Sequence, residues 1–138
     1  MIEFQNVSFA YENGDHAGQL HNINFTIPDG QVVLLCGESG CGKTTLTRLL
    51  NGLIPNYYEG RLEGRVFIDG KSIVEKPLYE IASLTGSVFQ NPRSQFFAVD
   101  TNSELAFGCE NLGIAENEII ARMKRTVAEL HIETLMDR

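Results

Sequence analysis

The sequence predicts an α/β fold that opens with antiparallel β structure, continues into the start of a parallel sheet and ends in helices. Three observations predict this fold. Residues 2–11 and 23–27 alternate apolar with polar side chains, as strands with one buried face do. Residues 32–36 are continuously apolar, which is typical of a strand covered on both faces. Residues 116–130 carry apolar side chains at a period of 3.6, which indicates an amphipathic helix.

Turn signals place the boundaries of the first elements. A turn is expected at residues 12–15, and Pro28-Asp29-Gly30 closes the second strand with turn chemistry. A glycine-rich loop follows the apolar run. Residues 44–50 then form a helix with its leucines on one face, and Asn51-Gly52 ends that helix.

The elements expected further along the chain are shorter, except for the last two helices. We expect an exposed loop at 56–64, a strand at 65–68, a helix at 77–84 that starts with Pro77, and a strand at 87–89. Thr101 is expected to cap a helix that runs to about Leu112, with Glu104 completing a capping box. The apolar face of the last helix is predicted to be core and consists of Ile119, Ile120, Met123, Val127 and Leu130.

Composition excludes several classes of protein. The chain has 138 residues, of which 43% are hydrophobic and 21% charged, as in one ordinary globular domain. Its net charge of −7 argues against a nucleic-acid surface, which needs clustered Lys and Arg. The longest apolar run is far shorter than the roughly 20 residues of a membrane span. Three cysteines without paired spacing indicate reduced thiols rather than a disulfide framework.

One loop carries the clearest chemistry. Residues 37–44 read Gly-Glu-Ser-Gly-Cys-Gly-Lys-Thr and fit the phosphate-binding pattern GxxxxGK[ST]. The glycines let the main chain approach phosphates closely, and successive N–H groups form an anion nest at a helix N-terminus. Lys43 can reach the β- and γ-phosphates of a nucleoside triphosphate, and the Thr44 hydroxyl can ligate Mg²⁺. The predicted nucleotide-contacting residues of the loop are Gly37, Glu38, Ser39, Gly40, Cys41, Gly42, Lys43, Thr44 and Thr45.

Two alternatives stay open at the loop. The glycines would also suit a tight strand-to-helix turn that binds no ligand. Cys41 fits as a small residue, or as a regulatory thiol whose pKa a helix N-terminus would lower.

Together with two further segments, the loop resembles the ATP-binding subunit of ABC transporters. Residues 7–11 resemble the segment whose aromatic side chain stacks on adenine, which implies that role for Tyr11. Residues 88–92 resemble the Q-loop, in which a glutamine contacts Mg²⁺ and the attacking water, which implies that role for Gln90. The resemblance covers the whole chain and implies a P-loop fold of the ABC ATPase type that binds ATP and Mg²⁺. It also implies that Lys43 and Gln90 act in catalysis.

Within that family, the sequence is most similar to the ATPases of the energy-coupling-factor importers, which take up vitamins and metal ions. Residues 51–60, 90–97 and 104–113 carry this similarity. Other ABC importers and exporters stay open, as do a non-transport P-loop protein and a module that binds nucleotide only as a structural ligand.

The sequence also departs from the family pattern. It contains no LSGGQ signature, and no apolar strand ending in Asp-Glu follows Gln90. The switch histidine is missing too, because His131 has no matching context. We therefore expect residues 1–138 to form a partial ABC ATPase domain. Residues 1–90 would be the nucleotide-binding core through the Q-loop, and residues 91–138 would begin the helical subdomain.

The resemblance gives expectations for activity and partners. The chain should bind Mg-ATP but not hydrolyse it alone, because the general base is missing. The expected partners are a second ATPase domain, identical, different or fused, and a transmembrane subunit that contacts the Q-loop region. The expected location is the cytoplasmic face of the cell membrane, with no nucleic acid bound.

Overall fold

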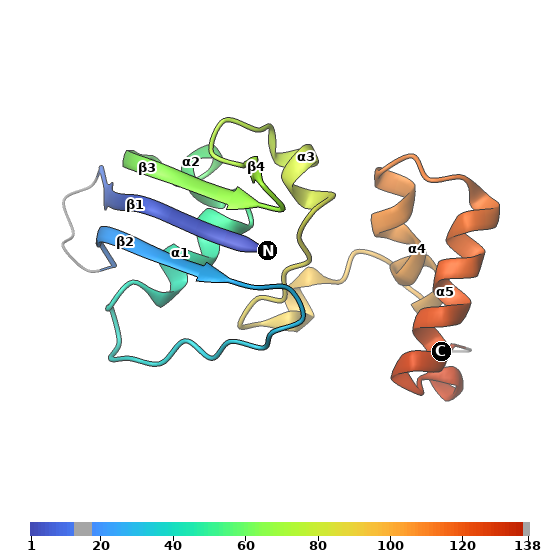
Figure 1. Ribbon diagram of the computed structural model, residues 1–138. Helices are drawn as coiled ribbons and strands as arrows, with labels where there is room; N and C mark the ends of the chain where they lie inside the picture. Colours follow the sequence, from blue (N-terminus) through green and yellow to red (C-terminus); the bar gives the residue numbers. More distant parts are fainter. Residues whose placement is uncertain (13–17, 137–138) are drawn as a thin grey trace. The chain divides into compact units, whose positions relative to one another are not determined.

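The computed structural model describes residues 1–12 and 18–136 of the chain (Figure 1). The chain divides into two compact units, Met1–Ser87 and Val88–Arg138, and each is described by itself. Most of the turn expected at residues 12–15 lies outside the described residues.

The first unit is built on a four-stranded antiparallel sheet in the order β2-β1-β3-β4. Its strands are β1 (Ile2–Tyr11), β2 (Leu20–Ile27), β3 (Gly60–Ile68) and β4 (Lys71–Ser72). Ile2 is paired with Ile27 on one side and with Ile68 on the other. The alternation of apolar and polar side chains thus correctly predicted the first two strands and their antiparallel pairing.

A bulge in β1 keeps the core side chains on one face. Phe4 and Val7 are both buried, although an odd spacing would place them on opposite faces of a regular strand. Between them Asn6 has a φ of 49°, and the register shifts against both neighbouring strands. Opposite the bulge, Gly64 has a φ of 84°, and a Cβ there would lie 2.3 Å from the Asn6 carbonyl oxygen. The extra residue therefore depends on a glycine in the partner strand.

Three helices pack against the sheet and complete the core. They are α1 (Lys43–Leu50), α2 (Leu53–Asn56) and α3 (Leu78–Ala82), and Figure 1 shows α1 and α2 behind the sheet. Each buried aliphatic or aromatic side chain contributes roughly 1.5–3 kcal/mol by leaving water. The core residues are Phe4, Val7, Phe9, Leu20, Leu49, Ile54, Val66, Ile68, Ile73 and Ile81.

Two helix predictions in this unit are confirmed. α1 ends as expected, because Asn51 donates its N–H to the Leu49 and Thr47 carbonyl groups and Gly52 follows with a φ of 75°. α3 is shorter than predicted, and Pro77 precedes its first turn.

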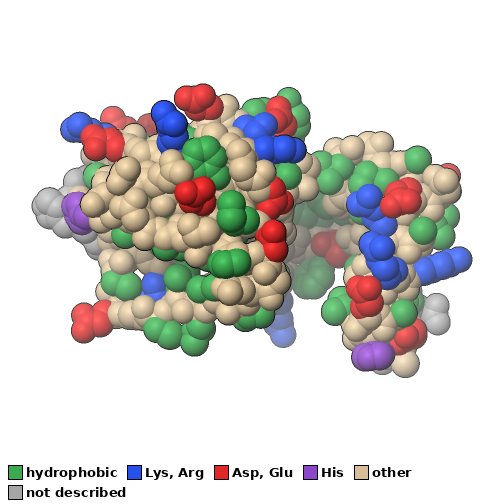
Figure 2. Space-filling view, viewed as in Figure 1, with side chains coloured by type: hydrophobic (Ala, Val, Ile, Leu, Met, Phe, Trp, Pro, Cys, Tyr) green, Lys and Arg blue, Asp and Glu red, His purple; other side chains and the backbone are tan. Residues whose placement is uncertain are grey.

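Two predicted strands and part of one predicted loop are wrong. Residues 32–36 do not form a strand, and Val32 and Leu34 are 100% and 84% exposed. Figure 2 shows apolar side chains along the lower rim of the unit, where Figure 1 draws this segment. Residues 87–89 form no strand either. Within the described residues neither run has a strand beside it, and an apolar run alone supplies no hydrogen-bond partner. Conversely, residues 60–64 lie in β3, where pairing with β1 extends the strand beyond the predicted start.

The second unit is helical. It contains η1 (Pro92–Gln95), α4 (Thr101–Asn111), α5 (Glu116–Leu130) and η2 (Glu133–Leu135). The predicted bounds of α5 are confirmed. Of its predicted core face only Ile119 is buried, whereas Ile120 and Leu130 are 44% and 62% exposed.

The predicted cap of α4 is wrong by one residue. Asp100, not Thr101, is the N-cap, and its carboxylate accepts from the Ser103 N–H at 2.9 Å. Glu104 does not complete a capping box. Its carboxylate accepts instead from the N–H groups of Phe97 and Ala98, at 2.9 and 2.8 Å. The Glu104 carboxylate, which in a capping box would accept from the backbone N–H of the N-cap residue, therefore binds the segment before the helix instead.

On the face in Figure 2, the Lys and Arg side chains of both units lie close to Asp and Glu side chains. None of the helices within residues 1–12 and 18–136 is both long enough and apolar enough to span a bilayer.

Candidate functional site

The glycine-rich loop leads directly into α1. Gly40 and Gly42 have φ values of 80° and 99°, a backbone region that side chains disfavour. Gly42 is also packed from behind, because a Cβ there would lie 2.8 Å from the Leu20 side chain and 3.3 Å from the Gln19 carbonyl oxygen. Both glycines are therefore required by the path of the backbone, and the N-terminus of α1 begins where the path ends.

The Lys43 ammonium folds back over the loop. It donates to the carbonyl oxygens of Gly37 and Glu38 at 2.9 and 2.7 Å, and it lies 3.6 Å from the Cys41 sulfur. The first turn of α1 carries no acidic side chain. A cation and the positive end of the helix thus lie at the same place, which is the arrangement that binds anions.

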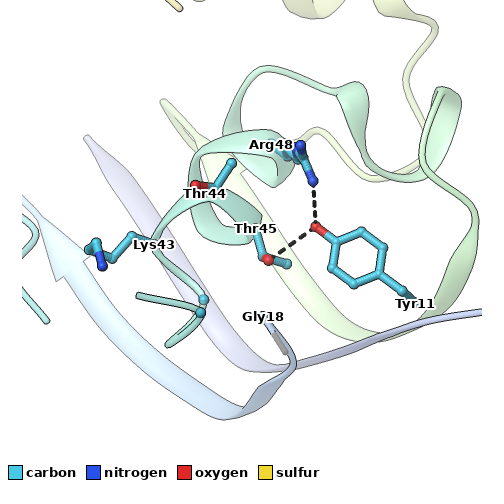
Figure 3. A pocket seen from close by; sticks show the side chains of 8 residues that line it. Tyr11, Gly18, Lys43, Thr44, Thr45 and Arg48 are labelled. Atoms are coloured by element: carbon cyan, nitrogen blue, oxygen red, sulfur yellow. Dashed lines mark hydrogen bonds between the residues drawn. The ribbon is translucent and has the colours of Figure 1, made fainter. Parts of the chain in front are cut away.

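A pocket of about 260 Å³ lies beside the first turns of α1 (Figure 3). Its lining combines loop backbone with side chains of α1 and the end of β1. The lining residues are Tyr11, Gly18, Gly40, Gly42, Lys43, Thr44, Thr45 and Arg48. All of them belong to the first unit.

Tyr11 forms one wall of this pocket, and its hydroxyl is held from two sides. The Tyr11 Oη lies 3.1 Å from the Thr45 Oγ1, and the Arg48 guanidinium donates to it at 2.9 Å (Figure 3). The Phe9 ring stands perpendicular to the Tyr11 ring, with centroids 4.8 Å apart. The last residue of β1 is therefore fixed to the first two turns of α1.

The structure brings many of the predicted site residues together. Tyr11, Gly40, Gly42, Lys43, Thr44 and Thr45 line the pocket. Gly37 and Glu38 contact Lys43 through their carbonyl groups, and Glu38, Ser39, Cys41 and Thr44 are exposed. Gln90 is exposed and belongs to the second unit.

Two lining residues were missed by the sequence interpretation. Arg48 follows Thr45 by three positions, which places both on one face of α1, and this spacing could have suggested it. Gly18 has a φ of 79° and donates its N–H to the Gly40 carbonyl oxygen at 2.7 Å. Nothing in the local sequence around Gly18 marks that long-range bond.

Comparison with known proteins places this site in a family. Residues 20–138 match the family model described as "ABC transporter". The chain is 47% identical, over its full length, to a putative ABC transporter ATP-binding protein of Treponema denticola, and covers 28% of that protein. It is 39% identical over 137 residues to one of Methanosarcina mazei, covering 99% of the chain and 23% of the relative. A putative ABC transporter ATP-binding protein of Pyrococcus abyssi is 41% identical over 124 residues, 90% of the chain and 44% of the relative.

The chain thus spans about a quarter of the length of the first two of these relatives. The match begins at the start of β2 and includes the loop, α1 and both helices of the second unit. A glycine-rich loop at the N-terminus of α1, a lysine folded over it and the extent of this match agree: the chain belongs to the ABC transporter family and corresponds to part of its P-loop ATP-binding domain.

Proposed function

We propose that this chain forms the nucleotide-binding half-site of a transport ATPase and holds Mg-ATP in the pocket beside α1. The observation that carries the proposal is the convergence of an aromatic wall, a cation and a helix N-terminus on that one pocket. Tyr11 would support the adenine base by stacking, and Lys43 with the loop N–H groups would hold the phosphates.

The phosphate end has donors suited to its charge. Lys43 would exchange its bonds to the Gly37 and Glu38 carbonyl groups for bonds to β- and γ-phosphate oxygens. Thr45 is buried in the first turn of α1 and is one of the residues that line the pocket. Glu38, Ser39 and Cys41 have exposed side chains. Their proposed contribution is through their backbone N–H groups, as part of an anion nest.

The pocket carries an oxygen ligand of the kind that Mg²⁺ prefers. The Thr44 hydroxyl is an exposed oxygen donor in the first turn of α1, next to Lys43, and Mg²⁺ prefers oxygen ligands and phosphates. Bound Mg²⁺ would neutralise part of the phosphate charge. By its resemblance to the Q-loop glutamine, Gln90 would supply a further contact to Mg²⁺ and to the attacking water.

At the level of the whole transporter, we propose that ATP binding and hydrolysis drive import, with vitamin or metal-ion uptake as the substrate class. The similarity of residues 90–97 and 104–113 to energy-coupling-factor ATPases supports this. No apolar strand ending in Asp-Glu follows Gln90 in this sequence, so hydrolysis would require a general base from outside this chain and a second ATPase domain. A transmembrane subunit would contact the exposed segment around Gln90 at the cytoplasmic face of the membrane.

A calorimetric titration with Mg-ATP tests the proposal directly. Wild type should bind, and Lys43→Ala should bind about ten- to a hundredfold more weakly, because a hydrogen bond to a charged group is worth about 1.5–3 kcal/mol. Lys71→Ala is the matched control, since Lys71 lies on β4 and does not line the pocket. Absence of binding by wild type, or equal binding by Lys43→Ala, would remove the proposed site. Sustained release of phosphate by the chain alone would contradict the proposed need for a general base from outside this chain.

A further inference from the structure

Arg48 lies at the centre of a contact network that the phosphate-binding pattern does not include. Its guanidinium donates to the Tyr11 Oη at 2.9 Å, and its Cζ lies 3.8 Å from the centroid of the Tyr58 ring. Arg48 is half-buried on the second turn of α1, and Tyr58 follows α2. The cation therefore bridges an aromatic ring on one side and the Tyr11 hydroxyl on the other.

The chemistry of the three groups fixes the direction of the bonds. Arginine has no acceptor, so the Tyr11 oxygen must accept from Arg48. The Tyr11 hydroxyl proton is then free to point at the Thr45 Oγ1, 3.1 Å away. One phenol oxygen is thereby held by two partners, both on α1 (Figure 3).

The ring itself is also confined. Phe9 stands perpendicular to it at 4.8 Å between centroids, and Tyr58 does so at 6.4 Å. A Cβ at Gly18 would lie 3.6 Å from the ring, so the chain passes close on a further side. Rotation of the Tyr11 side chain would break both hydroxyl bonds and these contacts together.

We propose that Arg48, seated on Tyr58, is a positioning residue that fixes the Tyr11 ring as the platform for the nucleobase, and so sets how much the base adds to affinity. The proposal rests on the proposed function, in which Tyr11 meets the base. An ordered platform binds more tightly than a mobile one, because the cost of ordering the ring has been met before the ligand arrives.

The test compares two ligands that differ in the base. Mg-ATP uses the platform and the loop, whereas inorganic tripolyphosphate with Mg²⁺ uses the loop alone. The measured quantity is the ratio of the tripolyphosphate Kd to the ATP Kd. For wild type this ratio should exceed one. In Arg48→Met the ratio should fall about five- to tenfold, which corresponds to losing much of the affinity that the stacking of one base contributes. Arg48→Lys keeps the charge and one donor and should recover part of the ratio.

A double-mutant cycle shows whether Arg48 acts through Tyr11. Tyr11→Phe removes the hydroxyl that accepts from Arg48 and should lower the ratio similarly. Arg48→Met in the Tyr11→Phe background should then lower it little further. Arg65→Met is the matched control, because Arg65 is an exposed residue of β3 that does not line the pocket, and it should leave the ratio unchanged. Thermal melting of each variant identifies loss of folding.

The outcomes separate the two proposals. If Arg48→Met weakens ATP and tripolyphosphate equally, Arg48 acts only as a charge and the positioning role is overturned. If Arg48→Met and Tyr11→Phe are additive, the two residues act independently and the role is likewise overturned. If wild type binds neither ligand, the proposed function itself fails. Arg48→Met that does not fold leaves Arg48→Lys and Tyr11→Phe to decide, since an unchanged ratio in both would reject the platform.

Discussion

The Gly18 N–H donates to the Gly40 carbonyl oxygen at 2.7 Å, and this bond joins the segment before β2 to the glycine-rich loop. Both residues have positive φ values, 79° and 80°, and both line the pocket beside α1. The bond is short and long-range, so the loop is held from outside as well as by its own helix. The part of the loop that would face phosphates therefore depends on a residue that the loop pattern does not contain.

This relationship predicts that Gly18→Ala weakens nucleotide binding. A Cβ at Gly18 would lie 3.0 Å from the Thr45 Oγ1, so the Thr45 hydroxyl that contacts Tyr11 would have to shift, whereas the Tyr11 ring at 3.6 Å would be in ordinary contact. We expect the Kd for Mg-ATP to rise roughly tenfold, which corresponds to about 1.4 kcal/mol. Calorimetric titration measures the change.

Gly30→Ala provides the control for backbone strain. Gly30 has a φ of 72°, and a Cβ there would meet nothing within 4 Å. Both substitutions should destabilise the fold by about 1–2 kcal/mol, because each forces a side chain into the left-handed region. Only Gly18→Ala should change the affinity for nucleotide. Equal affinity losses would mean that strain, not the contacts of Gly18, controls the pocket.

The bulge in β1 makes a separate prediction about stability. Gly64→Ala would place a Cβ 2.3 Å from the Asn6 carbonyl oxygen, in the middle of the pairing between β1 and β3. The unfolding free energy should fall by more than the roughly 1–2 kcal/mol of left-handed strain, because the strands must also separate. Chemical denaturation of Gly64→Ala and of Gly70→Ala measures the difference, since Gly70 has a φ of 72° and no neighbour within 4 Å. Equal losses would show that the bulge tolerates a side chain.

Residues 32–36 show where the sequence could not predict the fold. Their apolar character correctly marks a segment that favours burial, but a strand also needs a neighbour to accept its hydrogen bonds. In the part of the chain that the structure describes, no strand lies beside them. The strands β1 and β2 were predictable because each finds its partner within the same short stretch of chain.

This difference predicts contrasting hydrogen exchange. The amide protons of residues 32–36 should exchange within the fastest group of the chain, whereas those of β1, paired on both sides, should be among the slowest. Exchange followed by NMR or mass spectrometry distinguishes the two segments. Slow exchange at residues 32–36 that depends on protein concentration would indicate that they pair between copies of the chain.

The same distinction between a local sequence pattern and a long-range contact applies at the candidate site. Lys43 and the glycines were predictable, because the pattern that identifies them lies within eight consecutive residues. The spacing from Thr45 could have placed Arg48 on the same face of α1, but its contact with Tyr11 crosses 37 positions of the chain and was not predictable. The contact of Gly18 with Gly40 crosses 22 positions and was not predictable either. Gln90 was singled out by resemblance alone, and its role stays a prediction.

The N-cap of α4 supports a prediction about pH in the second unit. The Ser103 backbone N–H and hydroxyl, which donate to the Asp100 carboxylate at 2.9 and 2.7 Å, lower the pKa of that carboxyl below its ordinary value of about 3.9. A carboxyl whose pKa is lower in the folded than in the unfolded chain stabilises the fold above the unfolded pKa. That contribution is lost as the pH falls through the folded pKa. We therefore expect the Ser103 amide to lose protection from exchange below about pH 4 in wild type.

Two variants separate the Asp100 charge from the Asp100 cap. Asp100→Asn keeps an oxygen acceptor but does not titrate, so its Ser103 protection should vary less with pH than that of wild type. Asp100→Ala removes the acceptor and should show weak protection at every pH. The Glu104 carboxylate, which accepts from the N–H groups of Phe97 and Ala98, remains in both variants as a common background. An acid transition of equal size in wild type and Asp100→Asn would show that the pH dependence does not arise from the Asp100 carboxyl.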